Sequence, residues 1–293
     1  MNNDIETIMI LNTLDIDSIY SSLSAVFGLD RSYIENYISS NYWEIVENHY
    51  DEYTIESMDI SELLDIGNIK FIDSIIMHHI TPRPSEDSIW NEGICTLPRA
   101  LTTTTTLSTH LRKHGFTFNF RDNIVSISKD NELIDITKLK TSNLFMRFGG
   151  KYSFNDFNVN GYLFVDKFDY QSICGWFLCP EILQSLSQAL DDDSIAQSYA
   201  TSCRAYYVSF EVPIEQIDIT GFNANISLCR KNDIIIKYAI NALAHDKVKK
   251  NYFYTMNNPI IMLKRDYNVP SCDVRKVWCF DTSKFPKIIP IDK

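Results

Sequence analysis

Two adjacent histidines after an apolar run are the residues of this chain best placed to do chemistry. The run Ile75–Met77 leads into His78, His79, Ile80 and Thr81. Because neighbouring side chains of a strand point to opposite faces, at most one of the two histidines faces a given cleft. We expect it to be His79, since Thr81 shares that face and puts a hydroxyl beside the imidazole. The alternative is a hydrogen-bonded core histidine next to a surface one.

Glu211 is the strand-borne carboxylate that could act with a histidine. The segment 205–213 (AYYVSFEVP) is typical of a strand, and its alternation places Tyr207, Ser209 and Glu211 on one polar face. A carboxylate on such a face could line a cleft and stabilise a cationic transition state. The alternative is that this face is solvated at the edge of a sheet.

Two other constellations are weaker candidates for chemistry. His110 and His114 lie one helical turn apart, which suits zinc, but Leu-Arg-Lys between them offers no third ligand and would repel a cation. We therefore predict no metal. Cys174 and Cys179 are more typical of small buried residues than of a nucleophile.

Basic residues concentrate in one part of the chain, together with aromatic ones. Such a mixture suits single-stranded nucleic acid, because bases stack on rings while lysines neutralise phosphates. The alternative is a solvated helix end whose lysines complement the helix dipole. The residues are Arg230, Lys231, Lys237, Lys247, Lys249, Lys250, Tyr252, Phe253 and Tyr254.

The elements that must position these residues change character near residue 70. Residues 1–70 predict helices: a face begins at Ile5, Ile8 and Met9, and Ile19 to Phe27 form a clearer one that ends at Gly28. From residue 71 onward, strands broken by turns predominate, in an order that does not alternate evenly with helices. The sequence therefore predicts an acidic helical subdomain, 1–70, and an α+β domain, 71–293, with a split, largely antiparallel sheet and flanking helices.

Charge and composition limit the function classes. Residues 1–70 hold fourteen Asp and Glu against Arg31 and Lys70, a net charge of −12, whereas 71–293 carry +1. Such an acidic segment repels nucleic acid and membranes and suits a basic partner, although a solvated helical surface would look the same. No dinucleotide-binding or phosphate-binding glycine loop, signal peptide or membrane-spanning run occurs. Seven cysteines form no CxxC pair, so we expect a reduced, cytoplasmic protein.

Four segments share their order and residue types with a known family. They read HHIT…SIWNEGI, GYLFVDKF, AYYVSFEVPIEQI and NNPIIMLKRDYNVPSCDVRKVW. Together they resemble the ADP-ribosyltransferase fold, in particular the histidine-first branch and nucleic-acid-modifying toxins, with H-x-T followed by I-x-x-x-G-[IL]. The motif itself covers about 79–94, and the element order covers about 71–293. The resemblance implies an α+β protein whose split sheet holds NAD in a central cleft.

The same resemblance implies roles for individual residues. His79 contacts the nicotinamide ribose, with Thr81 beside it, and Tyr162 stacks on the nicotinamide, with Tyr170 as its rival. The family also uses a glutamate that stabilises the oxocarbenium-like transition state. The late strand where it is expected begins NNPI, without a carboxylate. Either Glu211 serves in its place or the site is altered.

Two functions are therefore open. The first is an NAD-dependent mono-ADP-ribosyltransferase, a toxin or antiviral defence effector whose substrate is NAD and whose acceptor is protein or nucleic acid. The second is a catalytically silent interaction protein that uses residues 1–70 to engage a basic partner. The H-x-T unit favours the first function, and the missing late glutamate favours the second.

Overall fold

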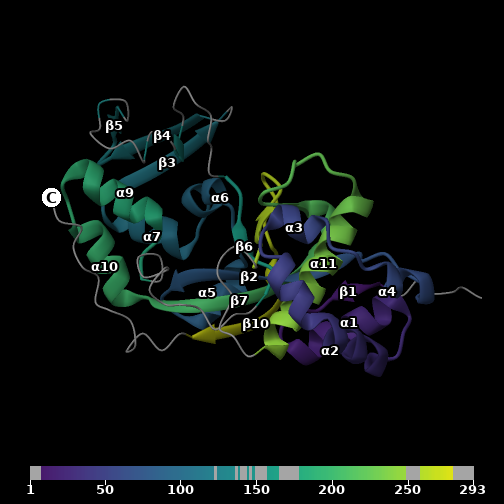
Figure 1. Cartoon of the computed structure of the whole chain (residues 1–293). Helices are drawn as coiled ribbons and strands as arrows, with labels where there is room; N and C mark the ends of the chain where they lie inside the picture. Colours follow the sequence, from purple (N-terminus) through teal and green to yellow (C-terminus); the bar gives the residue numbers. More distant parts are fainter. Residues whose placement is uncertain are drawn as a thin grey trace, which may run out of the picture. The chain divides into compact units, whose positions relative to one another are not determined.

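The structure is a computed structural model of the 293-residue chain. It describes residues 8–121, 124–135, 138, 144, 147–148, 157–164, 178–248 and 258–279. Over these residues the fold is α+β, as the sequence predicted (Figure 1). The pairs β2–β6, β6–β9, β8–β9, β3–β4 and β4–β5 are antiparallel, whereas β1 pairs with β2 in parallel.

The chain divides into two compact units, each built from several segments. Unit 1 comprises Met1–His79, Asn160–Asp169 and Ser209–Lys264, and unit 2 comprises Ile80–Val159, Tyr170–Val208 and Arg265–Lys293. Strands β2 (Ser74–Arg83) and β7 (Arg204–Pro213) each contribute residues to both units.

Unit 1 combines the N-terminal helices with five further strands and one long helix. In this unit the strand order is β7-β2-β6-β9-β8, with β1 paired to β2. The remaining elements are β1 (Ile10–Leu11), α1 (Ile16–Phe27), α2 (Arg31–Asn48), α3 (Glu52–Glu56), α4 (Ser61–Ile66), β6 (Asn160–Tyr162), η2 (Ile214–Gln216), β8 (Ile217–Ile219), α11 (Leu228–Lys247) and β9 (Ile260–Leu263).

Helix α11 is the centre of unit 1, because α1, α2 and α3 all pack against it (Figure 1). Its segment from Ile234 to His245 is buried on every side, including the polar side chains of Lys237, Asn241 and His245. A hydrogen bond from Asn241 Nδ2 to the His49 carbonyl, 2.8 Å long, joins residues 192 positions apart. The boundary expected at residue 70 therefore does not separate two compact units, since these helices need α11 to cover their apolar faces.

Unit 2 is built from short helices around a three-stranded sheet of order β3-β4-β5. Its core contains the completely buried Leu111, Phe116, Leu183 and Leu186. Strand β10 lies next to β7. The elements are α5 (Glu86–Glu92), α6 (Leu97–Thr102), α7 (Thr106–Lys113), β3 (Phe116–Arg121), β4 (Ile124–Lys129), β5 (Glu132–Ile134), α9 (Glu181–Leu190), α10 (Ser194–Ser202), η3 (Ser271–Asp273) and β10 (Val274–Cys279).

Local signals placed most elements correctly, with one clear error at the N-terminus. Helix α1 ends at Gly28, whose φ of 63° suits a residue without a side chain. Thr105 caps helix α7: its hydroxyl accepts from the Ser108 amide, and the Ser108 hydroxyl accepts from the Thr105 amide. The helix expected around Ile8 and Met9 is instead an approach to β1, because Ile10 pairs with Ser74.

Candidate functional site

His78 is fully buried, and its two ring nitrogens are both hydrogen-bonded. The Thr13 hydroxyl donates to the Ile76 carbonyl at 2.6 Å, so its oxygen accepts from His78 Nε2 at 3.0 Å. Nδ1 is then the acceptor for the Ser209 hydroxyl, 2.6 Å away. Burial lowers the pKa of His78 to about 3, although a hydrogen bond to the backbone of Thr13 opposes the shift. His78 is therefore a neutral histidine with satisfied hydrogen bonds.

His79 lies on the opposite face of β2, as strand alternation requires. It is half-buried, and its Nδ1–H donates to the carbonyl of Asn160 at 2.6 Å. Thr81, expected beside it, is 5 % exposed. His78 is therefore the hydrogen-bonded core histidine that the sequence left open as an alternative. That His79 faces a ligand stays a prediction.

Tyr162 lies on the face of His78 and not on that of His79. It is the direct cross-strand partner of His78, and side chains of such a pair share a face. Burial raises the pKa of Tyr162. The tyrosine expected to act with His79 is therefore separated from it by the sheet. Its rival, Tyr170, lies outside the described residues.

Glu211 also lies on the His78 face. Its Oε1 accepts a hydrogen bond from the Ser74 hydroxyl at 2.8 Å, and Ser74 precedes His78 by four residues on β2. The pairing of His79 with Glu211 as catalytic residues is thus wrong in this geometry. The alternative of a solvated face at the edge of a sheet is wrong, because β7 lies between β10 and β2 and both Tyr207 and Ser209 are buried.

The residue types named by the resemblance nevertheless meet, through a different histidine. His78, Tyr162 and Glu211 share one face of the sheet, together with Ser74, Ser209 and the hydroxyl of Thr13. We call His78, Thr13, Ser209, Ser74 and Glu211 the buried polar cluster. With His78 and Ser209 both fully buried, the cluster offers no route for a ligand to the imidazole.

The candidate zinc and cysteine sites are occupied by ordinary contacts. Nε2 of His110 donates to the Ile195 carbonyl at 2.9 Å, and Nε2 of His114 contacts the Ser198 hydroxyl at 3.0 Å. No group of metal-binding side chains occurs in the described part of the chain. Burial raises the pKa of Cys179 to about 12, which disfavours the reactive thiolate, and Cys174 lies outside the described residues.

Three of the basic residues considered for nucleic-acid binding are engaged within unit 1. Arg230 pairs with Glu56, and Lys231 pairs with Asp218 at 3.1 Å. Lys237 donates to the Glu56 carbonyl at 2.8 Å. These three side chains are therefore engaged by acidic or carbonyl groups of unit 1. Lys249, Lys250 and the aromatic residues 252–254 lie outside the described residues.

Unit 2 contains a cavity of about 380 Å³ that none of the residues predicted to bind NAD or to act in catalysis lines. Its walls come from the end of α5, the threonines before α7, one side of α7 and the end of α10. His110 reaches it from α7, where burial lowers the pKa of the imidazole. Arg83, adjacent to the lining residue Pro84, was not singled out in the sequence. The sequence signal that could have found it is its position between Pro82 and Pro84. Prolines end a strand, so Arg83 is expected where β2 passes into a loop.

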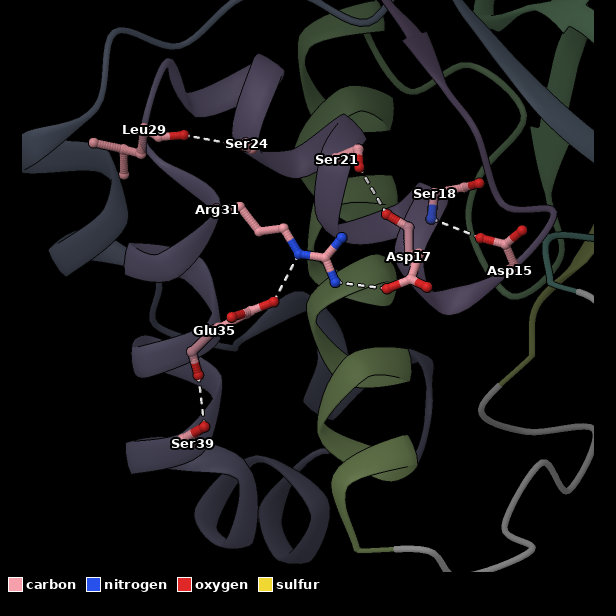
Figure 2. Close-up of polar contacts among 9 residues, drawn as sticks. All are labelled: Asp15, Asp17, Ser18, Ser21, Ser24, Leu29, Arg31, Glu35 and Ser39. Atoms are coloured by element: carbon pink, nitrogen blue, oxygen red, sulfur yellow. Dashed lines mark hydrogen bonds and ion pairs between the residues drawn. The ribbon is translucent and has the colours of Figure 1, made fainter.

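The acidic segment uses one of its two basic residues internally. Figure 2 shows Arg31 between Asp17 and Glu35, with nitrogen–oxygen distances of 2.6 Å to each. These hydrogen bonds, the one to Asp17 first, raise the pKa of Arg31. Glu44, Glu47 and Asp65 form no ion pair among the residues that the structure describes. The surplus of negative charge in the N-terminal helices therefore remains available to a partner.

Exposed apolar side chains gather next to this charge. We define the acidic-apolar surface as Glu62, Asp65 and the exposed apolar residues Ile8 (67 %), Leu64 (40 %), Ile66 (55 %), Ile69 (41 %) and Phe71 (40 %). The segment is fixed, because the amides of Asn68 and Lys70 donate to the Phe27 and Val26 carbonyls at 2.8 Å. The backbone next to Ile8 is held near the end of this segment, because the amide of Met9 donates to the Asp73 carboxylate at 2.7 Å.

Comparisons with known proteins add no relative to this description. Within the described residues, no helix has the length and apolar character needed to cross a membrane. Searches against family models, curated proteins and solved structures each found no match to this chain.

Proposed function

We propose that this chain is a catalytically silent interaction protein that binds a basic partner through the acidic-apolar surface. The observation that carries the proposal is the exposure of five large apolar side chains in a segment whose charge is strongly negative. Contiguous exposed apolar residues with a polar surround are typical of protein interaction sites. The partner expected from this chemistry is a segment with an apolar stripe and flanking lysines or arginines.

The separation of the predicted catalytic residues supports the same function. A transferase needs a carboxylate near the ribose that a histidine holds. Here Glu211 hydrogen-bonds Ser74 on one face of the sheet, and His79 lies on the other. His78, which shares a face with Glu211 and Tyr162, is fully buried. Binding without catalysis is consistent with this arrangement, since it does not require Glu211 and a histidine to act on the same ligand.

The first experiment measures binding of a designed probe. The probe is a fluorescein-labelled peptide with leucines at helical spacing and lysines elsewhere, compared with the same peptide carrying glutamates in place of lysines. We expect the full-length protein to raise the anisotropy of the lysine peptide only. Added salt should weaken this binding, because screening shortens the range of the charge–charge attraction.

Paired variants locate the binding surface. Ile66→Ser combined with Ile69→Ser should weaken binding by about tenfold or more, because buried apolar anchors carry most of the affinity of an interface. Leu133→Ser is the matched control, since Leu133 is 74 % exposed and belongs to unit 2. Equal weakening by the control, or equal binding of the glutamate peptide, would contradict the proposal.

A further inference from the structure

Arg83 is a buried cation whose charge lacks a counter-ion in the described part of the chain. Its residue exposure is 8 %, and its Nε is buried without a hydrogen-bond partner. None of the ion pairs formed among the described residues includes it. An unpaired buried charge is costly, and proteins usually place a carboxylate beside such a guanidinium. A missing internal carboxylate suggests that the negative charge comes from a ligand.

The cavity of unit 2 lies beside this cation. Pro84, the next residue, lines the cavity, as do Tyr199 and Cys203. Burial raises the pKa of both the Tyr199 hydroxyl and the Cys203 thiol, and the nearby charge of Arg83 opposes the shift in each case. Arg83 therefore influences the wall of the cavity electrostatically.

The other charged groups of the cavity leave it positive. Lys113, on the exposed side of α7, adds a second cation. The one carboxylate in the lining, Glu92, is already engaged: its Oε1 accepts from the Thr106 amide at 2.8 Å and its Oε2 from the Thr106 hydroxyl at 3.3 Å. That amide belongs to the amino end of α7, whose dipole offsets the charge of Glu92.

Neutral hydrogen-bonding groups complete the site. Because Nε2 of His110 donates to the Ile195 carbonyl, Nδ1 is the acceptor of the neutral ring. The hydroxyl of Thr109 and that of Ser202 lie in the lining as well. Such groups orient a polar ligand without adding charge.

We propose that this cavity binds a small organic anion, a carboxylate or phosphate ester, whose negative charge is balanced by Arg83 and Lys113. The volume of about 380 Å³ suits a metabolite-sized molecule. Arginine favours both carboxylate and phosphate, so the shared chemistry is an oxyanion. The site lies wholly within unit 2, and it is independent of the proposed binding of a basic partner by unit 1.

The test uses inorganic phosphate and succinate as separate probes, titrated into the full-length protein by calorimetry at constant ionic strength. We expect saturable binding near one site per chain, and the stronger of the two probes identifies the class of oxyanion. Ser202→Trp, at an exposed lining position, should abolish binding by filling the cavity. Lys113→Gln should weaken it by about two- to fivefold, as for an exposed charge pair.

Arg99→Gln provides the matched control, since Arg99 is exposed in α6 of the same unit and does not line the cavity. It should leave the affinity unchanged. Arg83→Gln tests the central residue, with its thermal unfolding recorded first; if it folds, it should weaken binding by more than Lys113→Gln does. Absence of saturable binding to both probes overturns the proposal, as does retention of full affinity by the folded Ser202→Trp protein.

Discussion

Two regions of this molecule place a histidine beside hydroxyl groups, and they differ in access. In the buried polar cluster of unit 1, His78 is fully buried and held by Thr13 and Ser209. In unit 2, Nε2 of His110 donates to the Ile195 carbonyl, and the residue lines a cavity together with several threonines. The comparison teaches that the same residue types form a binding site only where a cavity gives a ligand access to them.

The largest expected effect concerns the closed region. His78→Ala should lower the free energy of unfolding by about 2–4 kcal/mol, because it leaves a cavity and deprives the Ser209 hydroxyl of its acceptor. Urea denaturation measures the loss. His110→Ala, at the cavity of unit 2, is the comparison and should cost about 1 kcal/mol. Equal losses at the two positions would mean that the two histidines do not differ as described.

A pH titration sharpens the same comparison. The folded pKa of His78 is lowered from 6.5 to about 3, so folding favours the neutral ring. The resulting stability is present above pH 6.5 and is lost as the pH falls toward 3, with a slope of up to about 1.4 kcal/mol per pH unit. Unfolding curves for His78→Gln should lack this component, while those for the neighbour control His79→Gln should keep it. An unchanged pH dependence in His78→Gln would refute the assignment.

The next effect concerns the start of α7, at the wall of the cavity. Thr105→Ala should destabilise the protein by about 1 kcal/mol, because the Thr105 hydroxyl accepts from the Ser108 amide at 3.1 Å and caps the helix. Thermal unfolding measures the change. Thr105→Ser is the control, since serine retains the capping oxygen. A serine variant as unstable as the alanine variant would show that packing of the methyl group, and not the cap, stabilises this end.

The smallest effect is expected at Glu211. Glu211→Gln keeps an acceptor for the Ser74 hydroxyl, so stability should change by no more than about 1 kcal/mol. Incubation of either protein with NAD should release no nicotinamide above background. Release by the wild-type protein that disappears in a stable Glu211→Gln variant would instead establish the transferase, and it would show that the buried polar cluster opens.

The sequence predicted elements with strong local patterns. The strand at β7 and the glycine after α1 depend on residues close together in the chain, and both were confirmed. The sequence did not predict which helices pack on α11. That arrangement depends on contacts between residues such as His49 and Asn241, which no local periodicity encodes.

The candidate site was harder to predict for the same reason. Alternation correctly separated His78 from His79 onto two faces, but it gave no information about what covers each face. The cover of His78 includes Thr13, 65 positions earlier, and Ser209, 131 positions later. The two prolines beside Arg83 mark a strand end, but they do not reveal that its Nε is buried without a hydrogen-bond partner.

The division of the chain between its two units has a consequence for how the protein can vary. The backbone passes from one unit to the other five times, and both β2 and β7 are shared. A gene fragment encoding either unit alone therefore does not exist as one continuous stretch. Truncation from the N-terminus first removes part of unit 1, and truncation from the C-terminus first removes part of unit 2. Neither leaves one unit whole without segments of the other, so loss of a terminal segment should not yield a smaller working module. Insertions within exposed loops are the kind of change that the architecture tolerates.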